Sequence, residues 1–277
     1  MKLTSSVGAL LLASTALAAP APSKLTQRRH ERLAKRLANK HKTNPPLAVN
    51  HTSMKDTVAV NSPGFVEYDS NWAGAVIVSS GITEVTGTFT IPTVKEPSGG
   101  NSNTMYGAAA WVGIDGDTCQ SAILQTGVEF LVEGDSTAYE AWYEWYPNYS
   151  YNFDNFDVSP GDQIKATVKA TSLDSGTATL ENLSTGSSVT HTFKNEASEG
   201  SLCETNAEWI VEDFESGDSL VPFANFGSVT FTDCSYVHDG TTSGVSGATI
   251  LDVEQNGQVE TSCGTSGSSE VYCDYTG

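Results

Sequence analysis

Residues 122–132 read AILQTGVEFLV, and this stretch decides the fold class. Successive side chains of a β-strand point to opposite faces of its sheet. The face that would pack into a core holds Ala122, Leu124, Thr126, Val128, Phe130 and Val132. The opposite face holds Ile123, Gln125, Gly127 and Glu129. The pattern therefore predicts a strand with one buried apolar face and one face that presents an amide and a carboxylate.

Similar runs recur along the chain between turn residues. Alternation or β-branched composition predicts strands over residues 82–90, 106–114, 137–146, 163–171, 177–181, 188–193, 207–214 and 227–232. No convincing amphipathic helix follows residue 60. Many short strands without intervening helices are typical of all-β antiparallel sandwiches and barrels.

Three other predicted strands repeat the division into two faces. Residues 207–214 place Ala207, Trp209 and Val211 on one side and Glu208, Ile210 and Glu212 on the other. One face of 137–146 holds Glu140, Trp142, Glu144 and Tyr146, and 106–114 places Trp111 beside small residues. If these faces share one sheet, they form a polar groove lined by aromatic rings. A plain solvated surface is the alternative, but large exposed aromatic residues usually mark a binding site.

The charge is divided by position. Residues 1–60 hold 10 of the 14 Lys and Arg and two acids, whereas residues 61–277 hold four lysines and 31 acids, a formal charge of −27. So acidic a body repels itself near neutral pH and is relieved when its carboxylates are protonated. We expect a protein that works in acid, and we expect it to lose stability toward neutral pH.

The ends of the chain predict processing. Lys2, the apolar run Val7–Leu17 and the small residues 16–18 predict a secretory signal peptide over residues 1–19, and hence an extracellular protein. The basic residues 20–60 are interpreted as a propeptide, although basic tails also bind nucleic acids or membranes. We expect this segment to inhibit the mature domain, residues 61–277, by charge attraction that acid weakens.

Five cysteines lie in the mature part, so at most two bridges form within the chain. Cys119–Cys203 and Cys263–Cys273 are the pairings we favour, which leaves Cys234, although connectivity cannot be derived from one sequence. The sequons at Asn148 and Asn182 suggest surface loops. Residues 97–103 predict a flexible loop that is open to proteolysis.

Several catalytic classes find no support. A single Asp174-Ser175-Gly176 does not supply the two loops of a pepsin-like enzyme, and it reads as a turn. No His-Glu-x-x-His or Gly-x-Ser-x-Gly motif occurs, and secretion argues against a cysteine nucleophile. Glu140 and Glu144 lie roughly 13 Å apart on an extended strand, too far for a glycosidase pair unless another strand supplies a carboxylate.

Five blocks of sequence resemble the glutamic peptidases, or eqolisins, of the scytalidoglutamic and aspergilloglutamic type. The blocks are Ser70–Gly74 (SNWAG), Ala110–Gly116 (AWVGIDG), Ile123–Gly127 (ILQTG), Trp142–Pro147 (WYEWYP) and Ala207–Ile210 (AEWI). The resemblance implies a concanavalin-like sandwich of two antiparallel sheets with a concave substrate groove. It also implies a secreted, acid-active endopeptidase that needs no metal or cofactor and is insensitive to pepstatin.

The resemblance also implies the site. The catalytic glutamine corresponds to Gln125 and the catalytic glutamate to Glu208, with Glu212 on the same face as a local rival. Glu208 would be the general base on water, and Gln125 would stabilise the oxyanion. The substrate-binding residues would be Trp111, Asp115, Trp142, Glu144 and Tyr146.

The expected partners are protein or peptide substrates and the chain's own propeptide, with no nucleic acid, no membrane and a monomeric state. A secreted carbohydrate-binding sandwich of lectin type is the alternative. It would explain secretion and an aromatic groove, but it gives no reason for Gln125 and Glu208 to share a face.

Overall fold

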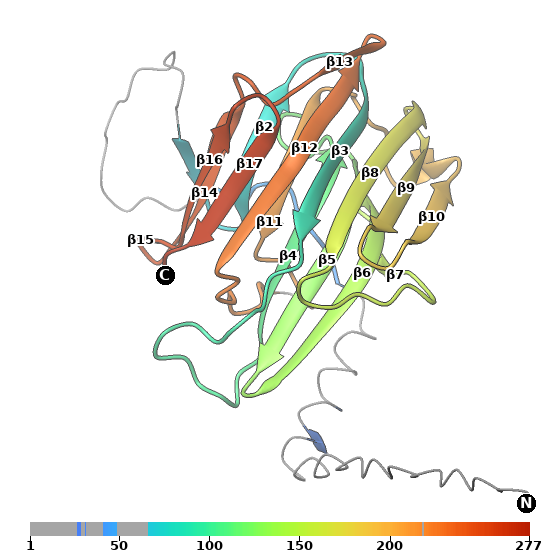
Figure 1. Cartoon of the computed structure of the whole chain (residues 1–277). Helices are drawn as coiled ribbons and strands as arrows, with labels where there is room; N and C mark the ends of the chain where they lie inside the picture. Colours follow the sequence, from blue (N-terminus) through green and yellow to red (C-terminus); the bar gives the residue numbers. More distant parts are fainter. Residues whose placement is uncertain (1–26, 29–30, 32–40, 49–65, 218) are drawn as a thin grey trace, which may run out of the picture.

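The computed structural model describes residues 27–28, 31, 41–48, 66–217 and 219–277, and the fold is a sandwich of two β-sheets (Figure 1). One sheet has nine strands in the order β1-β14-β2-β11-β4-β5-β6-β7, with β15 attached to β14. The other has eight, in the order β10-β9-β8-β3-β12-β17-β16, with β13 attached to β12. Strands β1 and β14 run parallel, and the strands around the centre of the larger sheet, from β2 through β11, β4 and β5 to β6, run antiparallel. The predicted all-β sandwich is confirmed.

The nine-stranded sheet consists of β1 (Val66–Asp69), β2 (Trp72–Val78), β4 (Tyr106–Ile114), β5 (Ile123–Glu133), β6 (Ser136–Tyr146), β7 (Tyr151–Asn152), β11 (Asn206–Glu212), β14 (Thr249–Gln255) and β15 (Gln258–Val259). The eight-stranded sheet consists of β3 (Ile82–Thr90), β8 (Gln163–Ser172), β9 (Ser175–Asn182), β10 (Ser187–Phe193), β12 (Ser228–His238), β13 (Thr241–Ser243), β16 (Thr261–Ser266) and β17 (Glu270–Tyr275). One short 3₁₀ helix spans Glu196–Ser198.

The alternation read from the sequence sets which side chains enter the core. The main core contains Leu124, Val128 and Phe130 of β5 and Trp209 and Val211 of β11, as predicted. A second apolar cluster lies on the outer face of the nine-stranded sheet. It contains Trp72, Val76, Ala109, Trp111, Ile123, Leu131, Trp142, Ile210, Phe214, Val221 and Leu251. This outer face is therefore not a plain solvated surface.

Both favoured disulfides are present, Cys119–Cys203 and Cys263–Cys273, and Cys234 is buried without a bridge. The sequon at Asn182 leads into a turn at residues 183–186 that is exposed, as expected of a surface loop. Asn182 itself is fully buried at the end of β9, where its side chain donates to Asp162 and accepts from the backbone of Ser184 and Thr185. Its side-chain amide therefore holds the turn.

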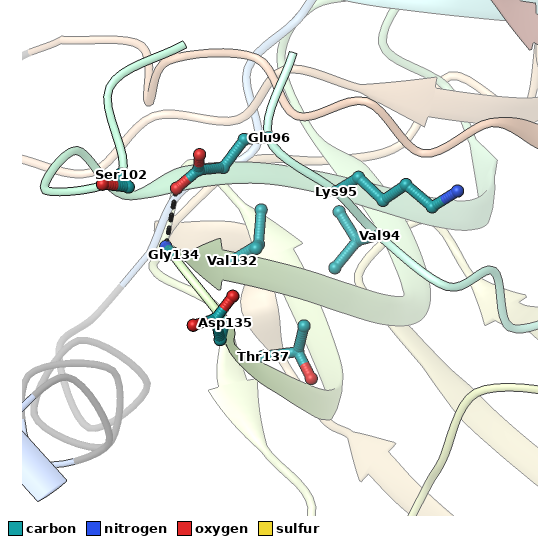
Figure 2. Close-up of a pocket in the computed structure, with 8 residues that line it drawn as sticks. All are labelled: Val94, Lys95, Glu96, Ser102, Val132, Gly134, Asp135 and Thr137. Atoms are coloured by element: carbon teal, nitrogen blue, oxygen red, sulfur yellow. Dashed lines mark hydrogen bonds between the residues drawn. The ribbon is translucent and has the colours of Figure 1, made fainter. Parts of the chain in front are cut away.

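The loop between β3 and β4 is open to solvent over residues 98–103. Beside it lies a pocket of about 520 Å³, lined by Val94, Lys95, Glu96, Ser102, Val132, Gly134, Asp135 and Thr137 (Figure 2). The Glu96 carboxylate accepts a 2.7 Å hydrogen bond from the Gly134 amide, which ties this loop to the turn between β5 and β6. None of the predicted site residues lines this pocket.

The predicted signal peptide and most of the predicted propeptide lie outside the described residues. Within the described part of the chain, no helix is long and apolar enough to cross a membrane. Residues 41–48 of the basic segment are described and lie against the nine-stranded sheet.

Candidate functional site

The outer face of the nine-stranded sheet gathers the predicted polar residues into rows. Strand register places Glu208 of β11 opposite Gly113 of β4, Gly113 opposite Gln125 of β5, and Gln125 opposite Glu144 of β6. A second row runs through Ile210, Trp111, Gly127 and Trp142, and a third through Glu212, Ala109, Glu129 and Glu140. The four strands thus bring together an amide, several carboxyls and two indoles.

Residues 41–48 lie across this face as an extended segment. Lys42 exchanges two backbone hydrogen bonds with Glu215, at 3.2 and 3.0 Å. Further along, Leu47 donates its amide to Asn71 and accepts from the amide of Ser70. Isolated backbone bridges near its two ends, Lys42 to Glu215 and Ala48 to Asp69, hold the segment on this face.

Thr43 is the residue of this segment that meets the predicted glutamine. Its hydroxyl accepts a hydrogen bond from Nε2 of Gln125 and donates one of 2.9 Å to Oε2 of Glu144. The amide of Thr43 donates to the same carboxylate oxygen at 3.3 Å. Gln125 and Glu144, on two adjacent strands, therefore both hydrogen-bond Thr43.

The next residue meets a carboxylate from a different strand. The amide of Asn44 donates a 3.1 Å hydrogen bond to Oε1 of Glu212, and Nε1 of Trp111 donates one of 2.9 Å to Oε2. Glu212 thus contacts the peptide link that follows Thr43. An amide and a carboxyl from β5 and β11, more than eighty residues apart in sequence, converge on two successive residues of the segment.

The segment also carries two basic side chains, His41 and Lys42, onto the acidic face. The His41 ring bonds Oε2 of Glu129 through Nδ1, and its centroid lies 5.1 Å from that of Phe214. Nζ of Lys42 lies 5.0 Å from the centroid of the Tyr146 ring. Such a position attracts a cation to the electron-rich face of the ring.

The carboxyls under the segment are held away from water. Burial raises the pKa of Glu144 to about 8, although its hydrogen bonds from Thr43 oppose the shift. Burial likewise raises the pKa of Glu212 well above its usual range. The nearby Glu144 carboxyl adds to this shift, and the bonds from Asn44 and Trp111 oppose it. Both groups are fully buried.

Glu208 occupies the same face but has different surroundings. It is fully buried, and neither of its carboxylate oxygens has a hydrogen-bond partner among the described residues. Burial raises its pKa well above the usual range, and the Asp115 and Asp117 carboxyls add to the shift. The structure therefore brings Glu212 to the bound segment and leaves Glu208 beside Gly113, without a hydrogen bond to residues 41–48.

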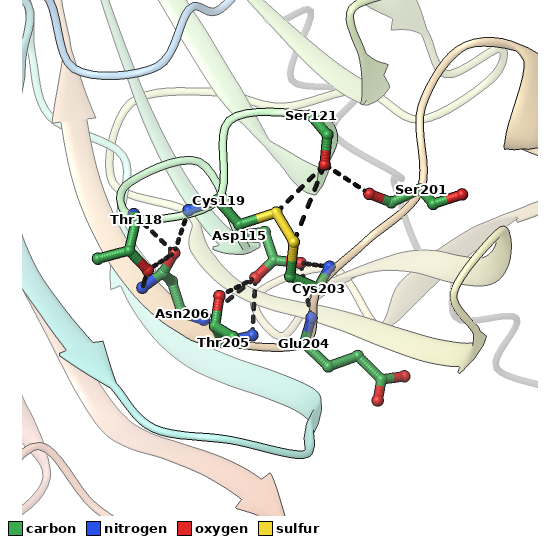
Figure 3. The surroundings of a disulfide bond; sticks show 9 residues. All are labelled: Asp115, Thr118, Cys119, Ser121, Ser201, Cys203, Glu204, Thr205 and Asn206. Atoms are coloured by element: carbon green, nitrogen blue, oxygen red, sulfur yellow. Dashed lines mark hydrogen bonds between the residues drawn. A yellow bond between two sulfur atoms is a disulfide. The ribbon is translucent and has the colours of Figure 1, made fainter.

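The five predicted binding residues separate into two groups. Glu144 and Tyr146 contact the segment, Trp111 bonds Glu212, and Trp142 lies in the outer apolar cluster. Asp115 is placed elsewhere. Its carboxylate accepts hydrogen bonds from the amides of Cys203, Glu204, Thr205 and Asn206 and from the Thr205 hydroxyl, next to the Cys119–Cys203 bridge (Figure 3). Asp115 thus fastens the start of β11.

The sequence did not predict that residues 41–48 reach this face, or that Glu129 meets His41. The charge division was the only available signal, and it indicated attraction without a location. Among the described residues, no group of three or more His, Cys, Asp or Glu side chains is arranged to hold a metal ion.

The arrangement is that of a peptide-binding face with an amide and an acid at its centre. The sequence profile of the Peptidase A4 family matches residues 70–275, and the chain therefore belongs to that family, the glutamic peptidases or eqolisins. It is thus a glutamic endopeptidase.

Individual relatives agree with this assignment. The chain is 52% identical to Aspergillopepsin-2 of Aspergillus niger, over 97% of this chain and 98% of the relative. It is 44% identical to Scytalidopepsin B of Scytalidium lignicola, over 99% of this chain and 100% of the relative. A crystal structure of scytalido-glutamic peptidase with a peptide-based transition state analog superposes with a TM-score of 0.67 at 48% identity, covering 75% of this chain and 98% of that one.

Proposed function

We propose that this glutamic peptidase is secreted, works in acid, and cleaves peptide bonds with Gln125 and Glu212 as its catalytic pair. The observation that carries the proposal is the hydrogen bonding of two successive residues: Thr43 to the Gln125 amide and Asn44 to the Glu212 carboxylate. A substrate bound along the same path would present a carbonyl and an amide nitrogen to these two groups.

In this mechanism the ionised Glu212 takes a proton from a water molecule, whose oxygen attacks the substrate carbonyl. Nε2 of Gln125 donates a hydrogen bond to the oxyanion that forms on the carbonyl oxygen. The protonated Glu212 then returns its proton to the leaving amide nitrogen, and the C–N bond breaks. The Asn44 amide lies 3.1 Å from Oε1 of Glu212, which is the place this last proton transfer requires.

Contacts of the two glutamates favour Glu212 over Glu208 as the base. Glu212 is bonded by Trp111 and by the segment, whereas the Glu208 carboxylate has no hydrogen bond to any described residue, residues 41–48 included. The sequence-based choice of Glu208 depended on its motif. The two assignments predict opposite outcomes for the activity of Glu208→Gln.

Residues 41–48 have the contacts expected of an inhibitory pro-segment. They occupy both proposed catalytic groups and keep water from the carboxyls beneath. Burial beneath the segment raises the pKa of Glu144 and Glu212, and the hydrogen bonds from Thr43 and Asn44 only partly oppose this rise. By linkage these two carboxyls favour binding of the segment in acid, so its release in acid depends on the wider charge attraction between the basic residues 20–60 and the acidic body, which protonation of the carboxylates weakens. Departure of the segment readmits water, which favours the ionised base.

The contacts of residues 41–48 add hydrogen bonding to the predicted electrostatic inhibition. Of the described basic residues in the segment, His41 pairs with a carboxylate, and most other contacts are hydrogen bonds to acceptors on the sheet. The domain limits 1–19, 20–60 and 61–277 remain part of the proposal. The lectin alternative is not favoured, because the family of the chain is one of peptidases.

The test compares Glu212→Gln and Gln125→Ala with the wild-type enzyme on haemoglobin at acid pH, after activation of the full chain. Pepstatin and a chelator are both present. Loss of the base lowers kcat by about 10²–10⁴-fold, and loss of the amide donor lowers it by about 10²–10³-fold. Thermal unfolding of each variant controls for folding. Folded variants with wild-type kcat would rule out the pair.

A further inference from the structure

Glu208 reaches from β11 across the neighbouring strand toward Gln125. Oε2 of Glu208 lies 3.3 Å from the position that a Cβ atom on Gly113 would take. Gly113 is paired with Glu208 on one side and with Gln125 on the other. Because Gly113 has no side chain, the Glu208 carboxyl extends over β4, and only one further strand spacing, about 4.8 Å, separates it from β5.

Buried polar atoms without partners lie at both ends of this short path. Oε1 of Gln125 and both carboxylate oxygens of Glu208 are buried, and none has a hydrogen-bond partner among the described residues. Nε2 of the same glutamine faces the bound segment through Thr43. Buried polar groups of native proteins are nearly always hydrogen-bonded, directly or through an ordered water.

Only the protonated form of Glu208 can bond Oε1 of Gln125 directly. An ionised carboxylate is an acceptor, as is Oε1 of an amide, so these two groups attract each other only when the carboxyl carries a proton. The charged groups that act on Glu208 are Asp115 and Asp117, both acidic, and its strand partners are Val76 of β2 and Gly113 of β4. These surroundings disfavour the ionised form.

We propose that Glu208 is a positioning residue that, in its protonated form, donates a direct hydrogen bond to Oε1 of Gln125 and so keeps Nε2 turned toward the substrate. An amide can present either its NH₂ or its oxygen to the substrate, and only the NH₂ stabilises an oxyanion. The inference depends on the proposed role of Gln125, and it assigns Glu208 a function that does not involve proton transfer to substrate.

Glu144 does not take this role. Its Oε2 receives both the hydroxyl and the amide of Thr43, so its carboxyl is engaged by the bound peptide. Glu208 has no such engagement, which leaves it available to Gln125 whether or not the site is occupied. The orientation of the amide is then fixed before substrate arrives, as efficient transition-state stabilisation requires.

The test uses three variants of the acid-activated enzyme: Glu208→Gln, Glu208→Met and Glu212→Gln. Glutamine can still donate to Oε1 of Gln125, so Glu208→Gln keeps kcat within about threefold of wild type. Methionine has a similar length but cannot donate, so Glu208→Met lowers kcat by about tenfold to a hundredfold, less than full loss of the amide donor. KM stays within about twofold in both, because the group acts on the transition state.

Two outcomes overturn the inference. If Glu208→Gln is as inactive as Glu212→Gln, Glu208 carries a proton in the reaction. If a folded Glu208→Met keeps wild-type kcat, Gln125 needs no help from this side chain. If Glu208→Met does not fold, the pH profile of Glu208→Gln decides. The glutamine amide donates at every pH, so kcat of this variant persists to higher pH than in wild type. An unchanged pH profile counts against the proposal. Failure of the catalytic pair itself would appear separately, as activity in Glu212→Gln.

Discussion

Nε1 of Trp111 donates a 2.9 Å hydrogen bond to Oε2 of Glu212, across the boundary between β4 and β11. Strand register places Trp111 opposite Ile210, so Glu212 lies diagonally across from the indole rather than beside it. The indole spans this diagonal, and its N–H prefers the ionised form of the carboxyl. The bond therefore both orients the proposed base and opposes the effect of burial on its pKa.

Trp111→Phe tests this relationship. Loss of the N–H raises the pKa of Glu212 further, and the fraction of ionised base at a given acid pH falls. A hydrogen bond to a charged group contributes about 1.5–3 kcal/mol, so the acid limb of kcat/KM moves up by about one to two pH units. Trp142→Phe, on the same apolar cluster, is the matched control. An acid limb that stays in place would show that the indole does not tune the base.

The segment that covers the site predicts a pH-dependent inhibitor. A peptide of residues 41–48 inhibits the activated enzyme more tightly at pH 3 than at pH 5, because covering Glu144 and Glu212 raises their pKa and binding therefore takes up protons. Thr43→Val in the peptide removes the hydroxyl bonded to Gln125 and Glu144 and weakens inhibition by about tenfold to a hundredfold. Inhibition constants from steady-state rates provide the measurement.

The matched control peptide carries Leu47→Ala. Leu47 is 37% exposed, and the hydrogen bond from its backbone amide to the Asn71 side chain survives the change. This peptide inhibits like the parent. If both substitutions weakened inhibition equally, nonspecific binding rather than the contact with the catalytic pair would hold the segment in place.

Buried carboxyls away from the site predict instability toward neutral pH. Burial raises the pKa of Asp69 to about 7 and that of Asp252 to about 6. These values exceed the unfolded-state value of about 3.9. Each contribution to stability is therefore complete below about pH 4 and is lost as the pH rises through the folded-state pKa. The melting temperature falls between about pH 4 and pH 7.

Asp69→Asn isolates one of these groups. Asparagine keeps an oxygen for the amides of Asn71 and Trp72, which bond Oδ1 at 2.9 and 2.6 Å. The variant loses up to about 4 kcal/mol of the pH dependence of unfolding between pH 4 and pH 7. Asp174→Asn is the control, because the Ser172 and Ser175 hydroxyls hold the pKa of Asp174 below its usual value. Denaturant titrations at several pH values measure the free energy of unfolding of both variants. If this free energy varied with pH equally in both, the assignment of the pH dependence to Asp69 would be contradicted.

The two disulfides differ in the chain length that they close. Cys119–Cys203 spans 84 residues and Cys263–Cys273 spans 10. Chain entropy predicts that removing the first costs about 4 kcal/mol and the second about 2–3 kcal/mol. Paired serine variants, compared by denaturant unfolding, measure the difference.

The longer bridge also has a functional neighbour. It lies beside the Asp115 contacts that fasten the start of β11, the strand that carries Glu208 and Glu212. Loss of Cys119–Cys203 therefore lowers kcat as well, whereas loss of Cys263–Cys273 leaves kcat unchanged. If kcat fell equally in both variants, the longer bridge would have no specific role in positioning β11.

The alternation in residues 122–132 and 207–214 was enough to predict which side of each strand enters the core, while the choice of a sandwich over a barrel came from the family resemblance. Period-two patterning fixes the face of every side chain once a segment is extended, so Gln125, Glu208 and Glu212 could each be placed on the face opposite the core, but only the structure showed that these faces belong to one sheet. The resemblance of five blocks supplied the family, and the charge division supplied the expectation of an acid-active enzyme made with a basic segment.

Pattern could not choose between Glu208 and Glu212, because both have the same parity on the same strand. That choice depends on which side chains of β4 and of residues 41–48 lie against them, and these contacts join positions about 100 to 170 residues apart. The same holds for Asp115, whose motif suggested the site and whose carboxylate instead fastens β11. Sequence determined the faces of the strands because that property is local, and only the tertiary structure decided which acid meets the peptide, because strand order and register are set by packing of the whole sandwich.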